Sequence, residues 1–102
     1  MDSNLFYQEV YSVVKEIPEG KVATYKQIAY LIGYAQYSRM VGRALSDVAK
    51  ELCLPCHRVV NSCGRLVPLW TEQRNLLETE GVFFKSNGCV DMKRCQWKPE
   101  CE

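Results

Sequence analysis

The first half of the chain carries three apolar stripes with helical spacing, one after another, and this succession limits the possible folds more than any other feature. Residues 5–17 hold the first stripe, which consists of Phe6, Val10, Val13, Val14 and Ile17. Intervals of three and four residues place these side chains on one face and predict an amphipathic helix. Pro18 cannot continue a helix, and the following Glu19-Gly20 favours a turn.

The second and third stripes predict two shorter helices joined by a turn. Thr24 and Gln27 have the spacing of a capping box, so a helix is expected from Thr24 to a stop at Gly33. Ser38 is a good N-cap for the third helix. The apolar face expected for that helix consists of Val41, Ala44, Leu45 and Val48.

Two arginines of the third helix, Arg39 and Arg43, are four residues apart and so share a face. Two short helices, the second carrying arginines and small residues, form a helix-turn-helix outline. A helical hairpin with a solvated basic face gives the same pattern, so the outline alone leaves both interpretations open.

The second half predicts small β elements around one more helix. The expected segments are a buried strand over 54–60, a turn over 61–64, a return strand over 65–67, a helix capped by Thr71 and closed at Gly81, and a hairpin over 82–84 and 89–92. The fold class is therefore mostly α with small β elements. With 102 residues, a single domain over 1–102 is expected.

Charge and apolar runs restrict the location and the partners. The net charge is +1, so a DNA-binding surface must come from local placement of lysines and arginines. No apolar run reaches the length of a membrane span, and the N-terminus lacks the pattern of a secretion signal. A cytoplasmic protein is expected.

Six cysteines lie in the second half, at positions Cys53, Cys56, Cys63, Cys89, Cys95 and Cys101. Without an export signal, reduced thiols are expected rather than disulfides. Cys53 and Cys56 have the spacing of half a zinc site, but no second tight pair exists, so no metal is expected. A redox role for this pair would need a βαβ setting, and none precedes it.

The segment from Pro55 to Val60 carries the most chemistry, because Cys56 is followed by His57, the only histidine, and by Arg58. An imidazole and a guanidinium favour the thiolate, which is the nucleophilic form of cysteine. Neighbours on a regular strand point to opposite sides, so Cys56 and His57 could cooperate only through a turned backbone or a bridging water. A buried structural cysteine beside a half-exposed histidine is the alternative.

Three motifs resemble the O6-alkylguanine-DNA alkyltransferases. Leu54–Val60 closely resembles their acceptor-site motif, residues 20–29 resemble their Gly-Lys-Val-x-Thr-Tyr-x-x-Ile/Leu-Ala stretch, and residues 38–45 resemble their Ala-Arg-x-Val-Gly-x-Ala-Met recognition helix. The resemblance covers roughly residues 5–81. It implies a winged helix-turn-helix, acting as a monomer without a cofactor, that binds double-stranded DNA containing O6-alkylguanine in the minor groove. The damaged nucleotide must be flipped out, because a stacked, paired guanine cannot reach a thiol in a pocket.

The resemblance also assigns roles to individual residues. DNA binding falls to Tyr25, Arg39, Gly42 and Arg43, and catalysis to Cys56, His57 and Glu80. Val59 and Trp70 are expected in the base pocket, where Trp70 would replace an aromatic wall that the family has in a stretch missing here. Cys56 would accept the alkyl group, His57 would act as a base through water, and Glu80 would orient His57. Arg39 would fill the gap in the base stack, and Tyr25 would push on the target phosphate. Glu80 as a solvated charge and Trp70 as a core side chain remain the alternatives.

Three departures from the family pattern leave transfer open. The family's N-terminal domain has no counterpart here, as in the alkyltransferase-like proteins, which bind damage without removing it. Val48 replaces an active-site asparagine, which predicts slow transfer, and residues 65–70 replace a Gly-rich stretch. Yet this chain keeps Cys56 at the acceptor position, where non-catalytic relatives typically carry Trp or Ala, and His57 follows it directly. The expectation is therefore a single-turnover methyltransferase, with a sensor that flags lesions for other repair proteins as the alternative.

Overall fold

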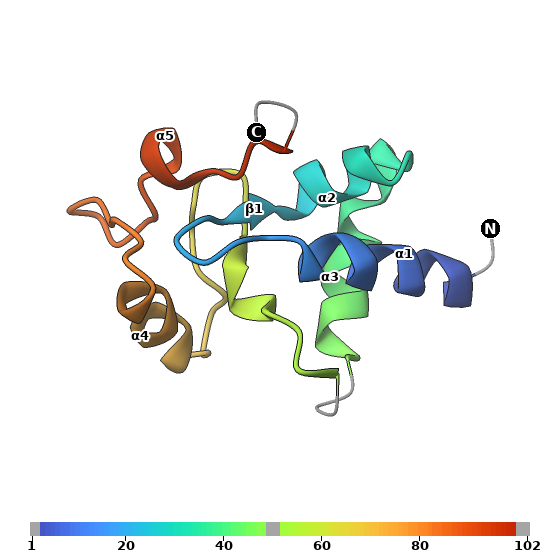
Figure 1. The fold of residues 1–102 in the computed structure, drawn as a ribbon, viewed down its shortest axis with the longest axis horizontal. Coiled ribbons are helices and arrows are strands. Elements are labelled where there is room, and N and C mark those ends of the chain that lie inside the picture. The colour runs from blue at the N-terminus through green and yellow to red at the C-terminus, as the bar shows by residue number, and fades with distance from the viewer. Residues whose placement is uncertain (1–2, 49–51, 100–102) are drawn as a thin grey trace.

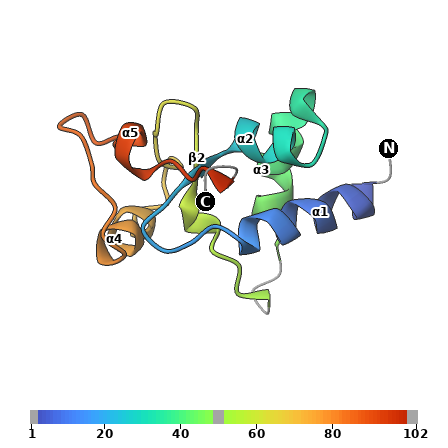
Figure 2. The same ribbon diagram turned by 45° about the horizontal axis from the view of Figure 1, so that its top comes forward.

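The computed structural model describes residues 3–48 and 52–99. The elements run in the order α1 (Ser3–Lys15), β1 (Ala23–Thr24), α2 (Tyr25–Leu31), the 3-10 helix η1 (Ala35–Tyr37), α3 (Ser38–Ser46), the 3-10 helix η3 (Cys56–Arg58), β2 (Val59–Val60), α4 (Glu72–Thr79) and α5 (Met92–Cys95). Helices α1, α2 and α3 gather at one end, α4 and α5 lie at the other, and the strands lie between them (Figures 1 and 2). No helix in these two ranges is long and apolar enough to cross a membrane.

The three predicted apolar stripes form α1, α2 and α3. The capping box at the start of α2 is confirmed: the Thr24 side chain accepts from the Gln27 backbone N–H at 2.9 Å, and the Gln27 side chain accepts from the Thr24 N–H at 3.3 Å. Phe6, Val10 and Val41 are buried together in the core between the helices. Burial of one face of each short helix is what stabilises it, since isolated helices of this length are marginal in water.

A two-stranded parallel sheet joins the two ends of the molecule. Ala23 pairs with Val59 and Thr24 with Val60. Ala23 and Val59 belong to the core packed by α1, α2 and α3, whereas Val60 belongs to a second core with Leu77 and residues near α5. Because successive side chains of a strand point to opposite faces, even this short sheet contributes to both cores.

The buried strand predicted over 54–60 is wrong except for its last two residues. Pro55 begins a tight turn instead, in which Cys56–Arg58 form η3 and only Val59–Val60 pair with β1. The return strand over 65–67 is also absent. The Val67 N–H is satisfied by the Gln73 side chain at 2.7 Å, so it takes no part in a ladder.

Two predicted helix caps are wrong. Ser38 is the first residue of α3 with helical dihedral angles, because η1 runs directly into α3 and leaves Tyr37 at the N-cap position. Thr71 precedes α4 in a helical conformation and makes no side-chain capping hydrogen bond. Helix α3 ends at Ser46, so Val48 lies beyond it and is half-buried rather than on its buried face.

The predicted C-terminal hairpin is reduced to one antiparallel bridge, between Phe84 and Val90. Helix α5 begins where the second strand was expected to end, at Met92. Gly64 allows the backbone at Val90 to approach closely. The Val90 N–H donates to the Gly64 carbonyl at 2.9 Å, and a Cβ on Gly64 would lie 2.6 Å from the Val90 oxygen. Close packing against another backbone therefore adds to the need for glycine at φ +83°.

We expect Gly64→Ala to lower the free energy of unfolding by clearly more than the roughly 1 kcal/mol expected for a positive φ alone. Gly33→Ala is the matched control, because Gly33 has φ +86° and no atom within 4 Å of its Cβ position. Urea denaturation of both variants measures the difference. Equal losses would show that the contact with Val90 costs nothing.

Candidate functional site

A small cavity brings together residues from four segments that lie far apart in the sequence. Its volume is about 150 Å³, and it is lined by Tyr25, Gly42, Leu45, Ser46, Cys56, Val67 and Trp70. Cavities of this order in other proteins hold a small aromatic ring. Four of the residues predicted for the site therefore line the same cavity, namely Tyr25, Gly42, Cys56 and Trp70. Trp70 lines this cavity, and its role in a base pocket stays a prediction.

The local turn decides how Cys56 and His57 are presented. The Cys56 N–H donates to the Leu54 carbonyl at 2.8 Å, and the Arg58 N–H donates to the Pro55 carbonyl at 3.0 Å. In this 3-10 helix the two side chains do not alternate as on a strand. Cys56 lines the cavity, while His57 points to Glu80 at the end of α4.

His57, Arg58 and Glu80 form a partly buried charged cluster. The Arg58 guanidinium donates from Nε to Oε1 of Glu80 at 2.9 Å and from Nη2 to Oε2 at 2.6 Å, and it donates from Nη1 to the Ile17 carbonyl at 2.7 Å. His57 Nε2 lies 2.8 Å from Glu80 Oε2, and the two side chains are 15% and 12% exposed. The alternative that Glu80 is a solvated charge is therefore wrong.

Burial raises the pKa of Glu80, but the hydrogen bonds from Arg58 and His57 outweigh it and hold the pKa below its usual value. Glu80 is consequently a carboxylate, which only accepts hydrogen bonds. His57 must therefore carry a proton on Nε2 and, when neutral, leave Nδ1 as an acceptor. This arrangement fixes the tautomer of the histidine next to Cys56.

The expectation that His57 and Arg58 hold Cys56 as a thiolate is wrong. Burial raises the pKa of the Cys56 thiol, and a hydrogen bond from its own backbone offsets this only in part. The Arg58 guanidinium is occupied by Glu80 and Ile17. Cys56 is thus a protonated thiol at neutral pH that needs a base to react.

Of the predicted DNA-binding residues, Arg39, Gly42 and Arg43 lie on α3 and Tyr25 begins α2. Arg39 and Arg43 are exposed and, with Met40, line a shallow depression away from Cys56. Gly42 faces inward, where a Cβ would meet the Tyr25 ring at 3.8 Å, an ordinary contact. Burial raises the pKa of Tyr25, and the neighbouring Cys56 adds to this.

Two positions named from the sequence lie outside the cavity lining. Val59, predicted for the base pocket, is completely buried in β2 opposite Ala23 and belongs to the core. Val48, which replaces the family's asparagine, follows the end of α3 and does not line the cavity. Gln73, in contrast, was not predicted and is fully buried beside the Cys56 turn, with hydrogen bonds to the carbonyls of His57 and Val59.

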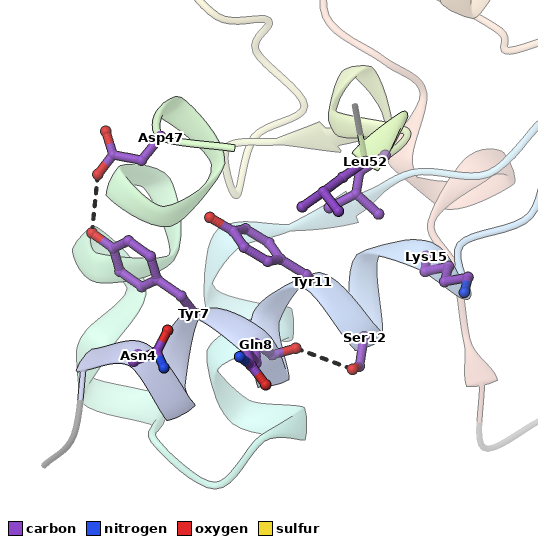
Figure 3. Close-up of a pocket in the computed structure, with 9 residues that line it drawn as sticks. Asn4, Tyr7, Gln8, Tyr11, Ser12, Lys15, Asp47 and Leu52 are labelled. Carbon is purple, nitrogen blue, oxygen red and sulfur yellow. Dashed lines mark hydrogen bonds between the residues drawn. The ribbon is translucent and has the colours of Figure 1, made fainter. Parts of the chain in front are cut away.

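A larger cavity of about 580 Å³ lies between α1 and the end of α3 (Figure 3). Tyr7 donates to the Asp47 carboxylate at 3.2 Å, and Tyr11, which also lines it, donates to the Ala44 carbonyl at 2.8 Å. Among the residues that the structure describes, none that lines this cavity is a cysteine or a histidine. The nucleophile therefore belongs to the smaller cavity.

The described residues give no cluster of three or more His, Cys, Asp or Glu side chains suited to a metal ion. Cys56, Cys63, Cys89 and Cys95 carry free thiols, and Cys101 lies outside the described residues.

Known proteins match this chain over most of its length. Residues 5–82 match the family model described as 6-O-methylguanine DNA methyltransferase, DNA binding domain. The DNA base-flipping protein of Vibrio parahaemolyticus is 35% identical over 92% of this chain and 97% of its own length. The methylated-DNA–protein-cysteine methyltransferase of Metallosphaera sedula is 40% identical over 83% of this chain, which spans about half (54%) of that protein.

Solved structures give the same picture. Alkyltransferase-like protein 1 of Schizosaccharomyces pombe, solved with damaged DNA containing O6-carboxymethylguanine, matches with a TM-score of 0.86 and 38% identity over 97% of this chain and 100% of that one. Mycobacterium tuberculosis OGT in complex with DNA matches with a TM-score of 0.67 and 34% identity over 74% of this chain and 48% of that one. The mostly helical, winged helix-turn-helix-like fold is thereby confirmed.

The Glu80 cluster predicts a specific pH dependence of stability. Because the pKa of folded Glu80 is lowered, its contribution is complete above the unfolded pKa of about 4.3 and is lost as the pH falls through the folded pKa. Glu80→Gln should therefore destabilise the protein by about 3 kcal/mol at neutral pH, because Arg58 loses its partner. The difference from wild type should shrink in acid.

Urea denaturation across the acid range measures this difference. Glu78→Gln is the control, since Glu78 pairs with Arg74 at 3.2 Å with both side chains nearly half exposed. Exposed pairs contribute little, so the control should lose less than about 1 kcal/mol. A Glu80→Gln loss as small as the control's would contradict this account of the cluster.

Proposed function

The chain belongs to the family of the 6-O-methylguanine DNA methyltransferase DNA-binding domain, and from this membership we propose a function in DNA repair. The protein binds duplex DNA, turns an O6-alkylguanine out of the base stack into the Cys56 cavity, and accepts the alkyl group on the Cys56 sulfur. One observation carries the proposal: a cysteine lines a small cavity, and the next residue is a histidine held by a partly buried carboxylate.

Helix α3 is the element that binds DNA in this proposal. Arg39 and Arg43 are exposed on this helix and supply local positive charge to a chain whose net charge is only +1. Extrusion of a base leaves a gap in the stack, and the planar guanidinium of Arg39 suits the task of filling it. To Tyr25, which lines the cavity, we assign the push on the phosphate of the extruded nucleotide.

The transfer step needs only groups of this chain and the damaged base. Cys56 passes its thiol proton through a water molecule to His57, whose Nδ1 is the available acceptor. The sulfur then attacks the alkyl carbon: the S–C bond forms, the C–O6 bond breaks, and its electron pair goes to the guanine. The proton on His57 then passes through the water molecule to the guanine. The products are unmodified guanine in the DNA and a thioether on Cys56. Glu80 stabilises the transient imidazolium, as the carboxylate does in other histidine-activated nucleophiles.

A second function is favoured by a different observation. Burial raises the pKa of Cys56 and Arg58 is engaged elsewhere, so the thiol is poorly activated before a base is bound. Relatives that match over nearly their whole length are a DNA base-flipping protein and an alkyltransferase-like protein. In this alternative the same cavity holds the lesion without transfer, and the complex marks it for other repair proteins.

Transfer predicts a covalent mark on one residue. Incubation with duplex DNA containing O6-methylguanine should add the mass of one methyl group per chain, on Cys56, without turnover. Intact mass spectrometry followed by peptide mapping measures it. Cys56→Ser should bind the same DNA and gain no mass. Tight binding by the wild type with no gain in mass would reject transfer and favour the sensor.

Arg39 should control the preference for damaged DNA. Arg39→Ala should reduce the ratio of affinities for lesion and undamaged duplex by about tenfold. The variant loses the side chain that fills the gap left by the extruded base, and unstacking costs a few kcal/mol. Arg74→Ala removes the same charge from α4 and should leave this ratio unchanged. Fluorescence anisotropy at two salt concentrations measures both, and affinity should fall with added salt. Equal ratios for the two variants would rule out this role for Arg39.

A further inference from the structure

Gln73 has a position that polar helix residues rarely occupy. It lies in the first turn of α4 with no exposed surface, and all its side-chain partners are backbone groups. Its Oε1 accepts from the Val67 N–H at 2.7 Å, and its Nε2 donates to the carbonyls of His57 at 3.1 Å and Val59 at 3.2 Å. Burial of an amide is costly unless it is hydrogen-bonded, so these partners fix its orientation.

These bonds connect two segments that contribute to the cavity lining. His57 belongs to the turn that presents Cys56, whereas Val67 and Trp70 line the wall contributed by residues 65–70. The backbone of Gln73 reinforces the connection, because its N–H donates to the Trp70 carbonyl at 3.2 Å. One residue therefore links the acceptor turn to the aromatic wall.

Helix α4 thereby holds His57 at two points. Gln73 binds the His57 backbone carbonyl, and Glu80, seven residues later, binds the His57 ring. Seven residues are two helical turns, so both side chains lie on the same face about 10 Å apart along the helix. The backbone and the ring of the histidine are consequently positioned by one rigid element.

We propose that Gln73 is a positioning residue that sets the separation between Cys56 and the Val67–Trp70 wall, and that it thereby selects the size of the O6-alkyl group that the cavity accepts. The inference rests on the proposed binding of O6-alkylguanine and applies to both transfer and sensing. Without Gln73 the wall is held to the turn by fewer bonds and moves away. Larger alkyl groups then fit better, while methyl groups are held less well.

The test uses Gln73→Met, since methionine is unbranched and similar in size but cannot hydrogen-bond as glutamine does. Affinities for duplexes with O6-benzylguanine and O6-methylguanine are compared in the Cys56→Ala background, in which no transfer occurs. The benzyl-to-methyl affinity ratio should rise about fivefold, the equivalent of one net hydrogen bond. Hydrogen exchange of the Val67 amide should accelerate at least tenfold.

Leu77→Ala is the control for general destabilisation, because Leu77 is fully buried on α4 but packs in the second core. It should lower stability and leave the ratio unchanged. If Gln73→Met does not fold, Gln73→Asn takes its place with the same expected rise, because it keeps an uncharged amide whose shorter side chain cannot span all three backbone partners.

An unchanged ratio in the Gln73 variant, while the wild-type cavity binds lesion DNA in preference to undamaged DNA, overturns the inference alone. Equal affinity of the wild type for lesion and undamaged duplex overturns the proposed function and this inference together. If the benzyl-to-methyl affinity ratio rises in both Gln73→Met and Leu77→Ala, the effect comes from lowered stability in general, and the inference about Gln73 is overturned.

Discussion

The ion pair between Arg58 and Glu80 is the interaction on which the rest of the site depends. It joins the turn after Pro55 to the end of α4. The same guanidinium donates a hydrogen bond to the carbonyl of Ile17, two residues after the end of α1. A carboxylate this little exposed would be costly without such a partner. The pair also keeps Glu80 ionised, and an ionised Glu80 in turn determines which nitrogen of His57 carries the proton. A structural contact thus controls the chemistry of its neighbour.

The elements predicted correctly were those that local rules determine. Helical periodicity and the capping box at Thr24 act within a few residues, and they located α1, α2 and α3. The segment after residue 52 depends on partners far away in sequence. Val59 was expected in the base pocket, but pairing with Ala23, 36 residues earlier, places it in the core. Apolar residues near a nucleophile are thus ambiguous until the pairing is known.

Gln73 shows a different limit. In a helix rich in charged residues, a glutamine suggests a solvated position, and no rule of composition predicts its burial. A signal was nevertheless present, because Gln73 is four residues before the apolar Leu77 and seven before Glu80, and this spacing marks the inward face. Helical spacing thus locates polar residues that hold a site as well as apolar residues that form a core.

The turn that presents Cys56 is held by the side chains of other residues, and this independence has an evolutionary consequence. Apart from its sulfur at the cavity wall, Cys56 is held in place through backbone hydrogen bonds, while Arg58, Glu80 and Gln73 hold the turn. Replacement of the acceptor alone would leave the turn, the histidine and the cavity in place. Under the proposed function, a single codon change at this position would abolish alkyl transfer and leave lesion binding in place. Recognition and reaction are therefore free to diverge, and a gene duplication would supply both from one ancestor.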